Sequence, residues 1–422
     1  MNRIILVGNG FDLAHNLRTS YKHFIEWYWD EWLLKLRTCN DNTISNHLCS
    51  FTINNRPGSW QSFFYHNPNF FKSSKGYDIV GKMMKDDLFK VTICPFLNII
   101  CTSIDKKNWV DIENEYYLCL LKCDENTIKE LNKSFECIKQ ELVKYLNTIN
   151  HPETINEIKT LMQAPIRKSD VSIEGLNFWN DFMRDRCNYS EDKWNQLFSD
   201  YGINNGTNLG YIYKDLVGRW GFPNKSHYDL SEIDKMSEPE HYYHTLIPDR
   251  TLLLNFNYTT VADKYLPNSE RFSTIHIHGE LSDPNSIIFG YGDEKDKDYN
   301  GIIDKNDNEY LRHMKQPHYS ESDNYRQMLA FIESAPYQVY IMGHSCGNSD
   351  RTLLNTLFEH PNCVSIKPFY YVDEEGKEHY LDTVQNISRN FTDAKKMRDR
   401  VVNKMYCVPM PQLSGELEAN DE

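Results

Sequence analysis

The sequence lacks the long apolar runs by which membrane proteins are recognised. The most apolar stretch, near residues 91–104, is broken by Pro95 and Asn98 and falls short of the roughly 18 residues that a membrane-spanning helix needs. The first apolar strand begins at residue 3, which leaves no room for a cleavable leader. We therefore expect a cytoplasmic protein without a membrane partner.

Paired cysteines and a surplus of positive charge are also missing. The eleven cysteines never form a C-x-x-C pair, and the closest two are Cys119 and Cys123. Scattered cysteines of this kind are typical of reduced, buried thiols, so we expect neither a zinc site nor any other bound metal. The net charge of −14 makes nucleic acid an unlikely partner, because phosphates are neutralised by Lys and Arg.

The N-terminal stretch carries the first positive signal. Residues 4–7 form a short, unbroken apolar run that predicts a strand buried on both faces, and Gly8-Asn9-Gly10 follows at once. Glycines in such a turn let the backbone approach a ligand closely. The third glycine of the dinucleotide fingerprint would fall at Leu13, so this stretch alone leaves both a structural turn and a nucleotide site open.

Later apolar runs predict further strands at residues 250–254, 273–278, 287–289, 336–342 and 364–372. Polar clusters follow several of these runs: Asn255 and Asn257 after the first, His276 to Gly279 at the second, and Gly343 to Asp350 after the run at 336–342. Ligands of open parallel sheets sit at the carboxyl ends of strands. The repetition of such clusters therefore favours a nucleotide site.

The middle of the chain predicts helices rather than a second sheet. Periodic apolar positions indicate helices near residues 21–36, 108–122, 127–147, 153–163, 174–184 and 209–220, whereas residues 39–75 resemble a surface excursion. We predict an α/β fold with a discontinuous Rossmann-like core at residues 1–39 and 246–408. A mainly helical insertion or cap at 40–245, with Trp109 and Tyr116 buried, and an acidic tail at 409–422 complete the prediction. Within the core, the last helix is expected near 381–404 and a closing strand at 405–408.

Three carboxylates, Asp111, Glu113 and Glu115, lie near the start of the predicted helix at 108–122. Acidic residues in a first helical turn are favoured by the helix dipole, which is a sufficient structural explanation. Paired carboxylates also hold metals or a ribose, and the sequence leaves this alternative open.

Five blocks of the sequence occur in the order that is typical of a known family. GNGFDLAHNLRTSY, WVDIENEY, NFNYT, HIHGEL and GHSCGNSD resemble the signature blocks of AbiH-type bacterial abortive-infection proteins. The sequence departs from that pattern at Asn16 and Arg18, where the family usually has Gly and Pro. Since Asn tolerates left-handed backbone geometry, we expect the turn to survive.

The AbiH group is similar in turn to the sirtuin-like, NAD-binding Rossmann class, which implies a parallel sheet of that type. The resemblance matches Gly8 and Gly10 to an opening glycine turn, Asn257 to a ribose block, and His278-Gly279 to a catalytic His-Gly. Gly343 and Ser345 match a Gly-x-Ser phosphate turn. The four-cysteine zinc module of sirtuin deacetylases is missing here, so the resemblance implies NAD binding or hydrolysis and not deacetylation.

These signals predict an NAD⁺ glycohydrolase with three catalytic residues. His278 would accept a proton from water or a ribose hydroxyl, and Asn257 would orient the water or the ribose. Asp12 would support the developing cation, although a helix cap is an equal alternative. His276 competes with His278 for the role of base, since both should point to the same strand face. The residues expected to bind the nucleotide are Gly8, Asn9, Gly10, Phe11, Asn255, Tyr258, Gly279, Gly343, His344, Ser345 and Asp350.

Two other functions stay open at this point. One is a nucleotide-binding sensor without turnover that acts through a partner. The other is a metal-dependent hydrolase or nuclease with Asp111 and Glu113 as ligands. The sequence determines neither the natural nucleotide nor a phage trigger, and it leaves a homo-oligomer open.

Overall fold

The computed structural model describes residues 1–54, 58–68, 75–107, 110–150, 152–187, 189–201 and 245–413. Contacts between Cα atoms divide the chain into two compact units. Unit 1 comprises residues 1–16, 152–280 and 319–422, and unit 2 comprises residues 17–151 and 281–318. The domain boundaries predicted from the sequence stay a prediction, because such contacts do not show which part of a chain folds alone.

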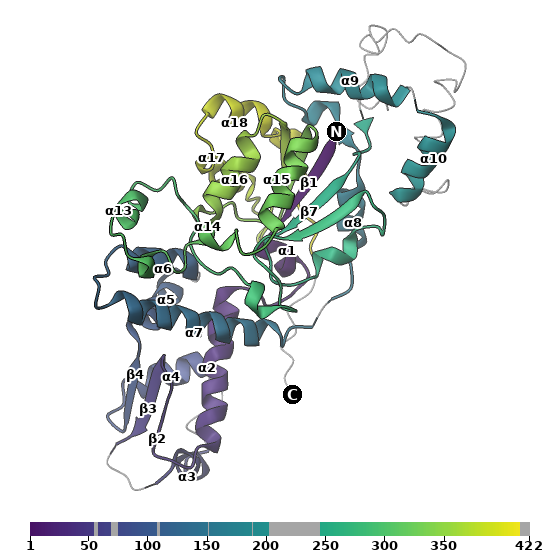
Figure 1. Ribbon diagram of the computed structural model, residues 1–422. Helices are drawn as coiled ribbons and strands as arrows, with labels where there is room; N and C mark the ends of the chain where they lie inside the picture. Colours follow the sequence, from purple (N-terminus) through teal and green to yellow (C-terminus); the bar gives the residue numbers. More distant parts are fainter. Residues whose placement is uncertain are drawn as a thin grey trace. The chain divides into compact units, whose positions relative to one another are not determined.

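Unit 1 is built on a five-stranded parallel sheet in the order β10-β9-β1-β7-β8. Its strands are β1 (Asn2–Val7), β7 (Thr251–Asn255), β8 (Phe272–His276), β9 (Tyr337–Met342) and β10 (Cys363–Phe369). Figure 1 labels two of its neighbouring strands, β1 and β7. Ile5 at the centre of β1 lies opposite Leu253 of β7 and Tyr340 of β9. The prediction that the first strand joins the later ones in one parallel sheet is confirmed. From β1 the chain adds β7 and β8 on one side and then β9 and β10 on the other, so the strand order reverses between β1 and β9.

Helices cover one face of this sheet. They are α15 (Asn324–Ser334), α16 (Arg351–Glu359), α17 (Tyr380–Arg389) and α18 (Ala394–Arg400). Alternate β1 residues, Ile4 and Leu6, share a buried core with Met328 of α15 and Leu354 of α16. This is the alternation that a strand in the middle of a sheet requires.

The other face carries a polar side chain at its centre. Arg3 is fully buried, and its Nη1 donates to the carbonyl oxygens of Met162 and Ala164 at 3.1 and 2.5 Å. Those carbonyls end α8 (Asn156–Gln163), so the guanidinium satisfies groups that a helix C-terminus leaves unpaired. The remaining elements of unit 1 are α1 (Asn9–Ala14), β5 (Ile166–Arg167), α9 (Leu176–Cys187), α10 (Glu191–Asp200) and β6 (Thr245–Leu246).

Unit 2 contains a second sheet, and the prediction of an irregular excursion at residues 39–75 is therefore wrong. The strands β2 (Thr43–Ser45), β3 (Cys49–Ile53) and β4 (Phe89–Ile93) form an antiparallel sheet in that order. Phe51 of β3 lies under Trp32 of α2, with ring centroids 5.1 Å apart. The helices of unit 2 are α2 (Tyr21–Thr38), α3 (Trp60–His66), α4 (Gly76–Met83), α5 (Pro95–Lys107), α6 (Ile112–Leu120), α7 (Ile128–Leu146), α13 (Tyr299–Ile303) and α14 (Lys315–His318).

Three smaller predictions also differ from the structure. Residues 287–289 are not a strand, and residues 404–406 form a 3-10 turn in place of a closing strand. The predicted last helix is two helices, α17 and α18. The predicted burial of Tyr116 is confirmed, whereas Trp109, the predicted helix at 209–220 and the tail beyond residue 413 lie outside the described residues.

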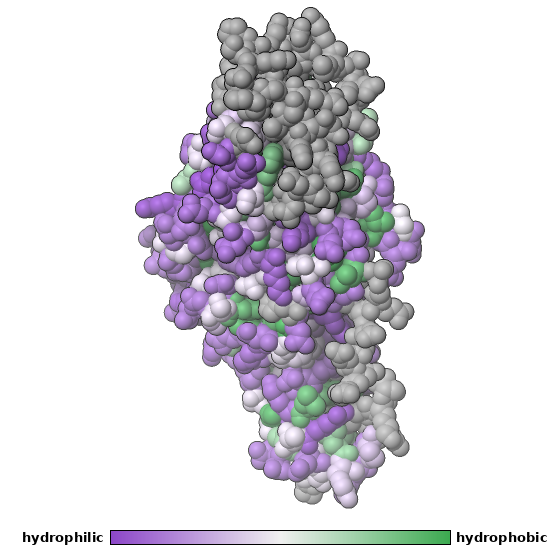
Figure 2. Space-filling model, turned by 90° about the vertical axis from the view of Figure 1, so that its right-hand side faces the viewer, coloured by the Kyte–Doolittle hydropathy of each residue, from purple (hydrophilic) through white to green (hydrophobic). Residues whose placement is uncertain are grey.

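The coloured surface in Figure 2 is mainly hydrophilic, with its hydrophobic residues scattered among polar ones. Within the described ranges, we find no helix whose length and apolar character would let it cross a membrane.

Candidate functional site

The two glycine turns of unit 1 pack directly against each other. Gly10 N donates to Gly343 O at 2.8 Å, which joins the turn after β1 to the turn after β9. A Cβ on Gly343 would lie 2.0 Å from Phe11 N, and a Cβ on Gly8 would lie 2.7 Å from His344 Cα. Close backbone contact is therefore sufficient to explain why glycine occupies these positions.

The same contacts use hydrogen-bond donors that a phosphate would need. Gly10 N is bonded to Gly343 O, and Phe11 N donates to Gly8 O at 2.8 Å. The phosphate-binding role of this turn stays a prediction. Asn16 adopts φ +59°, so the left-handed geometry expected at this position is present.

A buried amide–carboxyl cluster lies beside the first turn. Asn257 follows β7, and its Nδ2 donates to Gly8 O at 3.0 Å and to Asp12 Oδ1 at 3.1 Å. Thr259 Oγ1 donates to the other oxygen, Asp12 Oδ2, at 2.7 Å. Because the Gly8 carbonyl can only accept, the orientation of the Asn257 amide is determined. Asn257 thus has only its acceptor, Oδ1, left to offer a ligand.

Burial dominates the chemistry of Asp12. Its side chain is 1 % exposed, and burial raises the pKa of Asp12 to about 7 even though the bonds from Thr259 and Asn257 oppose the shift. Both oxygens are engaged by protein donors. Asp12 is therefore placed to orient Asn257 rather than to contact a ligand itself.

His278 lies in a second buried cluster after β8. Its Nε2 is 3.2 Å from Asp350 Oδ1 and 3.3 Å from the Tyr319 hydroxyl. The other carboxylate oxygen of Asp350, Oδ2, is 3.6 Å from His344 Nε2. The Phe256 ring packs edge-on against both imidazoles, with centroid distances of 5.2 Å to His278 and 4.2 Å to His344.

The two clusters are joined through Gly8, His344 and Phe256. Gly8 accepts from Asn257 and touches His344, which faces Asp350 beside His278. All of these residues lie in unit 1, at the carboxyl ends of β1, β7, β8 and β9. The sequence predicted His278, Asn257, Asp12, His344 and Asp350 as site residues, and the structure brings them together.

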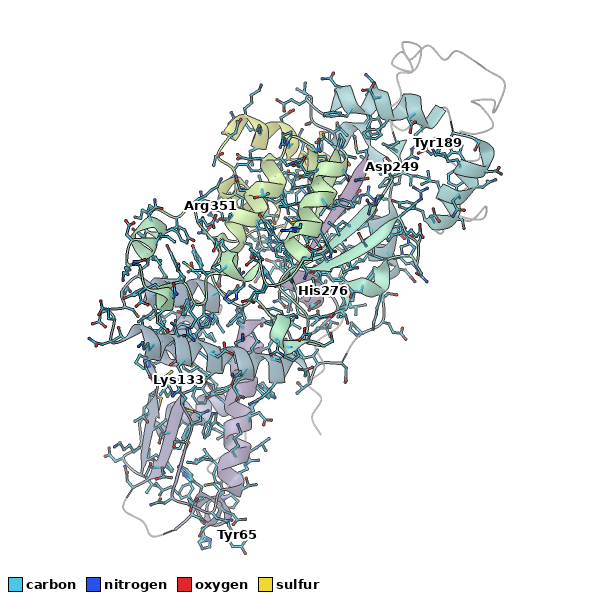
Figure 3. All side chains as sticks on the ribbon, in the orientation of Figure 1. Tyr65, Lys133, Tyr189, Asp249, His276 and Arg351 are labelled. Atoms are coloured by element: carbon cyan, nitrogen blue, oxygen red, sulfur yellow. The ribbon has the colours of Figure 1, made fainter. Side chains whose placement is uncertain are left out.

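His276 has different partners from His278. β8 ends at His276, so strand alternation no longer relates the two side chains. His276 Nε2 lies 3.0 Å from Asp263 Oδ2, and Figure 3 labels it at the end of the strand. Burial is the largest single effect and lowers the pKa of His276, but Asp263, the charge of Glu280 and the backbone of Asn257 together raise it, so the net shift is upward.

Several other predicted residues have structural explanations. Phe11 is fully buried, with its ring 4.8 Å from His15 and 5.4 Å from Tyr265. Asn255 is also fully buried, and its side chain closes the turn by bonding Asn257 N and Thr259 O. Gly279 adopts φ +81°, a conformation that favours glycine. The remaining predicted residues are Asn9 and Ser345, which are exposed, and Tyr258, which is half-buried.

Asp111 and Glu113 lie in unit 2 and are engaged there. Asp111 caps α6 by accepting from Asn114 N at 3.0 Å. Glu113 Oε1 accepts from Gly290 N at 2.9 Å and pairs with the buried Lys315 at 3.3 Å. These contacts favour the structural explanation of the two carboxylates. No group of three or more His, Cys, Asp or Glu residues able to hold a metal occurs among the residues described.

Tyr319 and Thr259 were missed as members of the site, and Asp263 was missed as the partner of His276. Thr259 ends the NFNYT block, which could have marked it, whereas no local motif marks Tyr319 or Asp263. Tyr319 lies 41 positions from His278 and stacks on Tyr325, with ring centroids 5.1 Å apart.

Comparison with known proteins gives one match. The family described as bacteriophage abortive infection AbiH matches residues 4–372 of this chain. No curated protein and no solved structure matches it. The sirtuin-like character of the sheet therefore stays a prediction.

Proposed function

The chain belongs to the bacteriophage abortive infection AbiH family, and from this premise we propose that it binds NAD or a related nucleotide and hydrolyses its N-glycosidic bond. The family suggests a role in abortive infection by phage. NAD hydrolysis would supply a chemical basis for that role, since loss of a central cofactor starves an infected cell. We place this activity in the cytoplasm, the location expected from the sequence.

One observation carries the proposal: a buried imidazole–carboxylate cluster and a buried amide–carboxyl cluster meet at the sheet edge where the strand order reverses. Ligands of open parallel sheets sit beyond the carboxyl ends of strands at such a reversal.

The chemistry follows from the groups at this edge. Water adds to the anomeric carbon of the ribose, and the electron pair of the breaking C–N bond leaves with nicotinamide. His278 accepts the proton that the water loses. Asn257 Oδ1 accepts a hydrogen bond from the water or from a ribose hydroxyl, which orients the reacting groups. Asp12 keeps Asn257 in that orientation.

The test is to incubate the purified full-length chain with NAD and to measure released nicotinamide, with and without a chelator. Release that survives the chelator supports the proposal. Release that stops with the chelator would favour a metal-dependent hydrolase instead. If the chain binds NAD calorimetrically but releases no nicotinamide under any condition, the non-catalytic sensor is the better description.

A further inference from the structure

Two histidine–aspartate pairs lie near the carboxyl end of β8, and they differ in burial. In the pair formed by His276 and Asp263, the carboxylate side chain is 31 % exposed. In the pair formed by His278 and Asp350, the imidazole is 5 % and the carboxylate 11 % exposed. Since solvent screens buried charges much less, Asp350 acts on its histidine more strongly than Asp263 does.

Asp350 stands at a position where its side chain would ordinarily cap a helix. It is the N-cap residue of α16, and Asp is among the preferred residues there because it accepts from the first free amides. Its side chain makes no such cap bond. The carboxylate turns instead toward His278 and His344, so α16 lacks the stabilising cap bond that an Asp at this position usually makes.

His344 supports the second oxygen of Asp350. His344 Nδ1 accepts from Cys346 N at 3.0 Å, which places the proton of a neutral imidazole on Nε2. That Nε2 is the atom 3.6 Å from Asp350 Oδ2. A neutral His344 leaves the negative charge of Asp350 available to His278.

The loop that holds His344 is itself fixed. Cys346 is buried and has φ +53°, which is uncommon for a residue other than glycine. Its carbonyl accepts from Asn390 Nδ2 at 2.9 Å, while its amide donates to His344. Such strain persists only where the surroundings over-determine the backbone.

From this geometry we infer that Asp350 is a positioning residue for His278: it fixes the proton on Nε2 and stabilises the cation that forms when Nδ1 accepts a second proton. A carboxylate can only accept, so the nitrogen that faces it must carry the proton. Nδ1 then takes the proton from the attacking water, and Nε2 keeps its own. The tautomer follows from the structure alone, whereas the identity of the reaction rests on the proposed function.

Two titratable groups, Tyr319 and His344, face this pair. The Tyr319 hydroxyl lies 3.3 Å from His278 Nε2 and can accept a hydrogen bond from that nitrogen. His344 faces Asp350 from the turn after β9. Phe256 separates the two imidazoles and contributes no charge.

The experiment is ¹⁵N NMR of the histidine side chains in the full-length chain, with His278 identified by comparison with His278→Gln. In the wild type we expect the Nε2–H tautomer above the pKa of His278. Asp350→Asn should lower that pKa by about one pH unit or more and reduce the preference for the tautomer. Asp263→Asn is the matched control, since it removes the partner of His276 and should leave the His278 signals unchanged.

Two outcomes would overturn the inference. One is a wild-type His278 that is protonated on Nδ1 in its neutral form, a result that needs no folded variant. The other is a folded Asp350→Asn protein whose His278 keeps both its pKa and its tautomer.

Kinetics separate this inference from the proposed function. If the chain hydrolyses NAD, Asp350→Asn should lower kcat by about 10²-fold or more with little change in KM, and it should shift the acid limb of the pH profile. If the wild type releases no nicotinamide, the proposed function fails, but the NMR spectra still decide the role of Asp350.

Discussion

Asp12 and Asp350 are both buried carboxyl groups, but their partners differ. Asp12 meets an amide and a hydroxyl, which are neutral donors, so its ionised form has no countercharge. Asp350 meets two imidazoles, one of which can become cationic. The first environment raises the pKa of Asp12 to about 7, whereas the second offers Asp350 a partner that can carry a positive charge. The two groups should therefore respond differently to replacement by Asn.

For Asp12 we predict an effect on the pH dependence of stability. Because the pKa of Asp12 is raised from 3.8 to about 7, the folded protein retains a proton between pH 4 and 7 that the unfolded chain has released. The free energy of unfolding therefore falls by at most about 4 kcal/mol as the pH rises through this window. Above the window it stays constant. Asp12→Asn removes this pH dependence, because the amide does not titrate. It keeps both hydrogen bonds: the amide oxygen accepts from Asn257, and the amide nitrogen donates to the Thr259 hydroxyl.

The measurement is the melting temperature of the wild type and of Asp12→Asn at pH 5 and at pH 8. The melting temperature of Asp12→Asn should increase relative to that of the wild type as the pH rises. Glu270→Gln, which changes an exposed carboxylate, serves as the control and should show no such gain. An equal difference between Asp12→Asn and the wild type at both pH values would contradict the prediction.

His278 and His276 offer a matched pair for catalysis. Replacing His278 by Ala should lower the rate of nicotinamide release by about 10² to 10⁴, the usual contribution of a general base. NAD affinity should stay within roughly tenfold, because a base acts mainly in the transition state. His276→Ala, which removes the partner of Asp263, should retain most activity. Full activity in His278→Ala together with loss in His276→Ala would transfer the role to His276.

Site residues that directly follow a strand could be predicted from the sequence, but the contacts between their side chains could not. His278, Asn257 and the residues after β9 stand in polar clusters behind apolar runs, which the sequence displays directly. The approach of Asp350 to His278 joins positions 72 residues apart and depends on how β8 and β9 are placed in the sheet. The separation of His276 from His278 depends on the residue at which β8 ends.

The contact between the two glycine turns is the main structural demand at this end of the sheet. Gly343 combines φ +74° with a Cβ position 2.0 Å from Phe11 N, whereas Gly376 has φ +81° and open space around it. Gly376→Ala should cost about 1–2 kcal/mol, the usual penalty for a left-handed residue. Gly343→Ala should cost clearly more, because the β1 turn must also move.

Urea denaturation of the two alanine variants measures this difference. Similar midpoints would show that the turns are not in contact in solution. Gly8→Val cannot serve as a variant that blocks NAD binding alone, because Gly8 also lies in the contact between the two turns. Its side chain would meet the backbone of His344, so a loss of NAD binding would not separate a blocked phosphate from a displaced loop.

The parallel sheet could be predicted from its sequence because each strand is a short, apolar run buried on both faces. The antiparallel sheet of unit 2 carried a weaker signal. In β3, buried Cys49, Phe51 and Ile53 alternate with Ser and Thr over only five residues, and 35 residues separate β3 from β4. Such alternation is the pattern of a half-buried strand, but the Asn, Ser, Pro and Gly residues around it favoured a loop. Residues 287–289 are apolar and buried, but they pair with no strand in the described chain.

The chain crosses between its two units more than once, and the family match spans both. Residues 17–151 and 281–318 form unit 2, while the match extends from residue 4 to residue 372. The candidate catalytic groups all lie in unit 1, whereas the block around Asp111 and Glu113 lies in unit 2 and has structural contacts. The family resemblance therefore rests on more than the candidate site, and a function that requires unit 2 alone would survive loss of His278.

This division leads to a prediction for the infected cell. Bacteria that express the wild type should lose NAD after phage infection and release fewer phage, while cells that express His278→Ala should keep both their NAD and their phage yield. The Asp263→Asn variant is the control for a changed imidazole–carboxylate pair at the same sheet edge. NAD and phage titre are measured in the same cultures, with protein levels matched by immunoblot. If His278→Ala still reduces phage yield while NAD stays constant, defence does not proceed through hydrolysis. In that case the chain acts as a sensor, and binding alone must be transmitted to a partner.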